Sequence, residues 1–168
     1  MMLLTVLLAV LMMAGLFLVL WAEVGFIQEK RFASSCPEEE LAVMPDTKPE
    51  RFRGQHVVGW LLAVVAVILL AGPMVLGALD GIRNGFTYWQ FFLRFLVMLL
   101  LLKAFDIGFF DWFLLCNNGF HFFAHYYPEV EPVLGPHLFG YNKKSHLVQV
   151  VIYIAASAAL AGILKLIF

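Results

Sequence analysis

Charged residues are scarce in this chain of 168 residues, and their scarcity excludes several classes of protein. Lysine, arginine, aspartate and glutamate make up 14% of the sequence, and the formal net charge is −1. Soluble globular domains carry charge on about a quarter of their residues. A nucleic-acid-binding protein would also need a surplus of basic residues. The composition therefore argues against a soluble domain and against nucleic acid as a partner.

Cysteines and the common catalytic motifs are also lacking. Cys36 and Cys116 stand 80 positions apart and form no metal-binding or redox motif. The sequence contains no glycine-rich phosphate loop, no Ser-His-Asp order and no CxxC pair. Nucleotide binding, acyl transfer by a serine triad and thiol redox chemistry thus have no support from motifs. No organic cofactor is predicted.

Long apolar runs are what the chain has in abundance. Hydrophobic residues make up 62% of the sequence, and the mean hydropathy is +0.88. A helix of about 20 apolar residues can cross a bilayer. We therefore expect an all-α, polytopic membrane bundle of four transmembrane helices, which form a single transmembrane domain over residues 1–168. The expected spans are about 2–22, 57–79, 88–116 and 146–168.

The first run has an alternative interpretation as a cleaved signal peptide. Signal peptides usually carry a basic region before the apolar stretch and end in a small-x-small cleavage site. Residues 1–21 contain no basic residue, and the run ends in Leu20-Trp21-Ala22-Glu23. We interpret it as a retained helix.

Two connections separate the spans on one side of the membrane, which we call the loop side. The polar loop 23–55 contains Pro37, Pro45 and Pro49, so we expect a solvated surface loop with at most a short helix starting near Pro37. The connection 117–145 is rich in aromatic residues and proline. Its segment Phe120–Tyr127 is too short to span, and it suits a re-entrant or interfacial position.

The basic residues predict an orientation. Seven of them belong to the loop side and three to the opposite side, and basic residues favour the cytoplasm. We therefore expect a multi-pass protein of the cell membrane, with loops 23–55 and 117–145 cytoplasmic and both termini outside. The loop-side residues are Lys30, Arg31, Lys48, Arg51, Arg53, Lys143 and Lys144, and the opposite ones are Arg83, Arg94 and Lys165.

The third expected span contains ionisable residues, which are costly at membrane depth unless they are paired or reach water. Lys103 and Asp106 are three positions apart, hence about 60° apart around a helix, and can touch. The pair is either a neutralising ion pair or a buried proton or substrate relay. A third alternative is that the lysine extends its amine to the interface.

Asp111 and His146 form a second candidate pair. Asp111 lies near the loop-side end of the third span and His146 opens the fourth, so antiparallel neighbouring helices would bring them together. The alternatives are an interhelical hydrogen bond that fixes packing and a catalytic or ion-binding pair. Lys103, Asp106, Asp111 and His146 are our candidate catalytic residues.

A metal site is the third possibility. If residues 120–127 are helical, His121 and His125 stand four apart on one face, as two metal ligands often do. The Glu of the H-E-x-x-H motif is missing, but Glu129, Glu131 and Asp111 are plausible further ligands. The alternative is a set of interfacial histidines in contact with headgroups and water. A divalent metal at His121, His125 and Glu129 is therefore one hypothesis.

The second half of the chain resembles a known group. Phe105-Asp106, Asp111-Trp112 and, after a proline-bearing connection, Gly140-Tyr141 and His146 form its pattern. This pattern is similar to that of a group of small bacterial four-helix integral membrane proteins without an assigned activity. The resemblance implies that Asp106, Asp111, Trp112 and His146 belong together, and it implies no mechanism.

Two function hypotheses follow. In the first, the protein is a structural or accessory subunit that binds another membrane protein, or itself, through small residues of helix 146–168. Ala155 and Ala159 stand four apart there, as do Ala158 and Gly162. In the second, it is a membrane-embedded enzyme or an ion- or proton-handling protein. Its polar site would then contain Asp106, Asp111 and His146, with His121 and His125 as further members.

Overall fold

The computed structural model is all-helical over the residues that it describes, which are 1–33, 36, 38–115, 122–133 and 143–168. Within these ranges, the only bridge between extended segments joins Glu29 to Thr47. Three helices are long and apolar enough to cross a membrane, namely Met2–Ile27, Gln55–Arg83 and Lys143–Ile167. The all-α class predicted from the sequence is confirmed, and the count of four spans stays a prediction.

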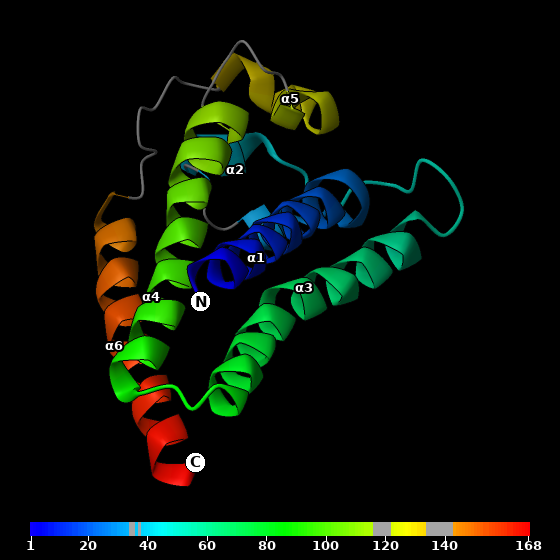
Figure 1. The fold of residues 1–168 in the computed structure, drawn as a ribbon. Helices are drawn as coiled ribbons and strands as arrows, with labels where there is room; N and C mark the ends of the chain where they lie inside the picture. Colours follow the sequence, from blue (N-terminus) through cyan, green and yellow to red (C-terminus); the bar gives the residue numbers. More distant parts are fainter. Residues whose placement is uncertain (34–35, 37, 116–121, 134–142) are drawn as a thin grey trace.

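Four long helices form two pairs. Helix α1 (Met2–Ala22) packs along α3 (Gln55–Arg83), and α4 (Tyr88–Phe105) packs along α6 (Lys143–Ile167). Figure 1 shows α4 and α6 running in opposite directions, and it shows the α1–α3 pair crossing them obliquely. Because α1 also contacts α4, the pairs share one core.

The third expected span begins where its sequence predicts and then changes its winding. Thr87 caps α4: its Oγ1 accepts a hydrogen bond from Gln90 N at 3.4 Å, and Gln90 Oε1 accepts one from Thr87 N at 2.8 Å. This reciprocal capping box satisfies two backbone donors. From Asp106 onward the chain continues as the π-helix η3 (Asp106–Leu115). The segment is therefore not the uniform α-helix that we expected.

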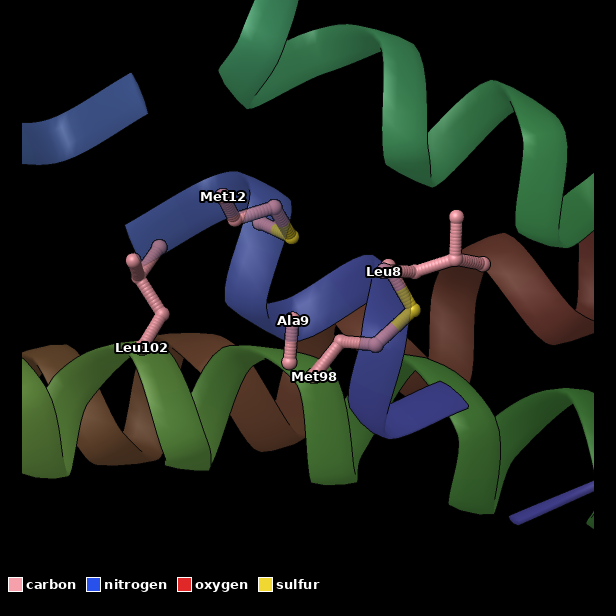
Figure 2. Close-up of a cluster of buried hydrophobic side chains, with 5 residues drawn as sticks. All are labelled: Leu8, Ala9, Met12, Met98 and Leu102. Atoms are coloured by element: carbon pink, nitrogen blue, oxygen red, sulfur yellow. The ribbon is translucent and has the colours of Figure 1, made fainter. Parts of the chain in front are cut away.

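The contact between α1 and α4 contains a buried apolar cluster. Figure 2 shows Leu8, Ala9 and Met12 of α1 meeting Met98 and Leu102 of α4. Ala9 and Met98 are completely buried. The small side chain of Ala9 lets the two backbones approach, and the flexible Met98 fills the remaining space.

The small residues of α6 divide between two faces. Ser157 and Ala161, four apart, are completely buried, and Ala161 packs against Phe91 and Phe95 of α4. Ala155 and Ala159 are exposed. The pair that we proposed for partner binding is thus not used by the core of the described chain, and its binding of a partner stays a prediction.

The loop side is more ordered than we expected. The short helices η1 (Glu23–Ile27), η2 (Lys30–Ala33), α2 (Glu38–Val43), α5 (Phe122–Tyr126) and η4 (Pro128–Val133) belong to this side. Figure 1 shows α2 and α5 together at one end of the bundle. The expected short helix near Pro37 is present as α2, although Pro37 itself lies outside the described residues.

Apolar packing explains this order. Val24, Met44, Tyr127 and Val130 form a buried cluster between the two loop-side connections. Glu40 is buried beside it, and its burial, aided by the nearby charge of Glu39, raises the pKa of its carboxyl to about 7. The interpretation of 23–55 as a solvated loop was therefore wrong for the part that packs on the second connection.

A glycine in α3 gives a first testable prediction. A Cβ added at Gly81 would stand 2.3 Å from Cε1 of Phe91, a ring that is almost fully buried. Because the ring cannot move aside freely, we expect Gly81→Ala to lower the free energy of unfolding by ~1–3 kcal/mol. Thermal unfolding in detergent micelles measures the change.

The matched control for that substitution is Gly162→Ala in α6. A Cβ at Gly162 meets no heavy atom within 4 Å. Alanine has the higher helix propensity, so Gly162→Ala should be neutral or stabilising by up to ~1 kcal/mol. Equal destabilisation by both substitutions would contradict the close packing of Gly81 on Phe91.

Candidate functional site

The π-winding of η3 is what aligns the two acidic residues of this segment. In an α-helix, residues five apart point about 140° away from each other. A π-helix closes hydrogen bonds between residues i and i+5, so residues five apart lie nearly above one another. Asp106 and Asp111 are five apart within η3. The change of winding therefore places both carboxylates on one face.

His146 of α6 completes this arrangement. Its Nε2 lies 2.7 Å from Oδ2 of Asp111, so the predicted contact between the third and fourth segments is present. Both side chains are mostly buried. Nδ1 of the ring lacks a hydrogen-bond partner among the described residues. The ring therefore has one nitrogen left for a further contact inside the protein.

Lys103 is the basic member of the cluster. Its side chain is only 4% exposed. Nζ lies 2.5 Å from Oδ2 of Asp106, so the two residues, three positions apart, form an ion pair. Nζ also donates a hydrogen bond to Oε1 of Gln149 on α6. The predicted contact between Lys103 and Asp106 is therefore present.

Sequence reasoning missed Gln149. A signal was available, because Gln149 is an amide in an otherwise apolar stretch and stands three residues after His146. Residues three apart share a helix face. From one face of α6, His146 therefore contacts Asp111 and Gln149 contacts Lys103.

Asp106, Asp111 and His146 form a group at metal-binding distance. One ligand atom from each lies within 4.8 Å of the others. Two ligands that are each ~2.1 Å from a shared ion stand roughly 3–4 Å apart. Small side-chain rotations would therefore suffice to close the three around an ion. With a neutral imidazole, the formal charges of the cluster and Lys103 sum to −1, which favours an added cation.

The other metal hypothesis used His121, His125 and Glu129. His121 is outside the described residues. His125 of α5 is exposed, and its ring packs edge-on against Tyr126 at 4.9 Å between centroids. Glu129 forms an ion pair of 2.9 Å with Lys48. A metal at these positions stays a prediction.

The chain matches no known protein family, no curated protein and no solved structure. The resemblance to small bacterial four-helix membrane proteins therefore stays a prediction. Any functional conclusion depends on the geometry of the chain itself.

Proposed function

We propose that the protein is a four-span integral membrane protein that binds a divalent metal ion with Asp106, Asp111 and His146. The observation that carries the proposal is the convergence of one ligand atom from each residue within 4.8 Å. These residues come from two segments, η3 and α6, that are distant in the sequence. In this proposal, α4 and η3 together form the third span.

The chemistry of the donors favours a transition metal. Two carboxylates and one imidazole suit Zn²⁺, Mn²⁺ or Fe²⁺, whereas calcium and magnesium sites use oxygen ligands. Nδ1 of His146, which has no hydrogen-bond partner among the described residues, leaves the buried ring with one nitrogen for a further contact.

Lys103 sets the charge of the site. Its positive charge offsets one of the two carboxylates, so the site has a formal charge of −1 without an ion. A divalent ion then brings the formal charge to +1. An anionic further ligand would restore neutrality, which is favourable in a partly buried site. Gln149 holds the ammonium group through its Oε1 and can retain it when Asp106 turns toward the ion.

The side of the membrane on which the metal site opens follows from the orientation expected from the sequence. The cluster lies at the end of α4 that leads into the loop side, where η3 contacts α5. If the loop side is cytoplasmic in the cell membrane, the ion reaches the site from the cytoplasm.

Metal analysis tests the proposal. Protein purified in detergent without chelator should contain a single transition-metal ion per chain, or bind one on titration with Zn²⁺ or Mn²⁺ and then unfold at a higher temperature. Replacing a residue that only hydrogen-bonds a metal ligand typically lowers metal affinity about 10–100-fold. Asp111→Asn and His146→Gln change ligands themselves, so each should weaken metal binding more than ~100-fold. His125→Gln is the matched control and should bind normally.

Two results would overturn the proposal. One is a folded protein that neither contains a transition metal nor binds Zn²⁺ or Mn²⁺. The other is binding that survives Asp111→Asn and His146→Gln but is lost in His125→Gln, which would move the metal to the loop-side histidine. The first result would favour the hypothesis that the protein is an accessory subunit.

A further inference from the structure

A second polar site lies on the loop side, away from the proposed metal ligands. It is a cavity of about 640 Å³ between the polar loop and helix α5, a volume within the range of small-molecule sites. Its polar walls are formed by Gln28, Lys48, Arg51, His125, Tyr126 and Glu129. Neither function hypothesis used Gln28, Lys48 or Arg51.

The positive charge of Arg51 is not compensated by a carboxylate within the described chain. Its Nη2 donates to the carbonyl oxygen of Gly25, and its Nε donates to Oε1 of Gln55 at 3.2 Å. Both acceptors are neutral. Lys48, in contrast, is paired with Glu129 at 2.9 Å. With a neutral His125, the walls therefore carry a net charge of +1.

Buried amides hold this arginine in place. Gln55 is completely buried, and its Nε2 donates to the carbonyl oxygen of Phe26 at 2.8 Å and to Oε1 of Gln28 at 3.1 Å. Its own Oε1 accepts from the backbone N of Arg51 at 3.0 Å as well as from the side chain. Such a satisfied network fixes the guanidinium before any ligand arrives.

The backbone of Gln28 connects two parts of the site. Gln28 ends the helix η1 in a left-handed conformation with φ of 54°, and its N–H donates to the carbonyl oxygen of Glu23 at 2.8 Å. The backbone carbonyl of Gln28 accepts a hydrogen bond from Lys48 N at 3.1 Å, which joins the loop bearing both cations to the end of η1.

Aromatic residues place the cavity at an interface. Nζ of Lys48 lies 4.6 Å from the ring centroid of Tyr127, and Cζ of Arg51 lies 5.4 Å from that of Tyr126. The hydroxyl of Tyr126 accepts a hydrogen bond from Nε1 of Trp21 at 3.1 Å. Tyrosine and tryptophan concentrate at headgroup level in membrane proteins. Burial raises the pKa of Tyr127 to about 12, so the ring beneath Lys48 stays neutral.

We infer that this cavity binds a phosphate ester, with Arg51 as the residue that recognises the anion and Lys48 as its neighbour. A guanidinium with free donors matches the geometry of phosphate oxygens, and a basic pocket at headgroup level suits anionic phospholipids. The phosphate belongs either to a lipid headgroup or to a soluble ester. This inference does not depend on the metal site.

Binding of short-chain phosphatidylglycerol and of inorganic phosphate to the full-length protein in neutral detergent tests the inference, with short-chain phosphatidylcholine as the reference lipid. We expect phosphatidylglycerol to bind and Arg51→Gln to weaken this binding about tenfold or more, since a charge-assisted bidentate contact is lost. Arg53→Gln is the matched control, because Arg53 is an exposed arginine of the same loop that does not line the cavity. It should change the affinity less than twofold.

The possible outcomes distinguish a lipid headgroup from a soluble phosphate ester, and they show when the inference is wrong. Arg51-dependent binding of phosphatidylglycerol alone supports a lipid headgroup, and Arg51-dependent binding of inorganic phosphate as well supports a soluble ester. Equal weakening by Arg51→Gln and Arg53→Gln, or no binding by either probe, overturns the inference. Thermal unfolding of each variant shows whether it is folded, and Lys48→Gln provides a second variant if Arg51→Gln does not fold. The metal content is expected to be the same in all of them.

Discussion

Replacing Lys103 with methionine is expected to lower the free energy of unfolding by about 3–5 kcal/mol, the cost of breaking a buried ion pair from one side. The side chain of Lys103 is 4% exposed, and its ammonium group contacts both Asp106 and Gln149. Without it, Asp106 and Asp111 remain as two neighbouring carboxylates, and His146 is the one other basic side chain paired with either of them among the described residues. Chemical or thermal unfolding in detergent micelles measures the loss.

The double substitution Lys103→Met/Asp106→Leu is the informative companion. It removes both charges, and replacing a whole buried pair by apolar residues is often close to neutral. We therefore expect the double variant to recover most of the lost stability. Lys165→Met, at an exposed position on α6, is the control and should stay within ~0.5 kcal/mol of the unmodified protein. A Lys103→Met variant as stable as that control would refute the buried ion pair.

The same variant bears on the proposed metal. Lys103→Met removes the cation that competes for Asp106, so added Zn²⁺ should stabilise Lys103→Met more than it stabilises the unmodified protein. In Lys103→Met/Asp106→Leu, which lacks one ligand, the effect of Zn²⁺ should be small.

Replacing Arg94 with leucine is expected to have an effect of similar size, about 3–5 kcal/mol. The guanidinium of Arg94 is completely buried between α3 and α4, where its Nη1 donates to the carbonyl oxygen of Gly77 at 2.8 Å and to Oδ2 of Asp80 at 2.7 Å. Its Cζ also lies 4.4 Å from the ring centroid of Phe86. Leucine would leave the carboxylate unpaired and give up the contact between cation and ring.

Two variants make this prediction specific. Arg94→Leu/Asp80→Asn should recover part of the stability, because the unpaired carboxylate is gone. Arg83→Leu, at an exposed position in the last turn of α3, should change the unfolding temperature little. If Arg94→Leu and Arg83→Leu unfold at the same temperature, Arg94 does not hold the turn between α3 and α4 together.

The positions of Arg94 and Gln149 illustrate how far sequence reasoning reaches. Arg94 entered the sequence argument only as a basic residue that helps to set the orientation, and its three neighbours come from a turn and a second helix. Gln149 was overlooked for a related reason. A polar residue in an apolar run signals a partner, but the identity of that partner depends on which helices pack together.

The sequence by itself determined the features that depend on neighbouring residues. Long apolar runs specified the helices and the start of α4 at about residue 88, and the spacing of three brought Lys103 to Asp106. Only the tertiary structure decided the rest. The π-winding of η3 aligned Asp106 with Asp111, the antiparallel packing of α6 on α4 brought His146 to them, and the packing of the polar loop on α5 placed Arg51 in the wall of a cavity. These contacts join segments that are distant in the chain, and their free energy comes from packing that no local pattern encodes.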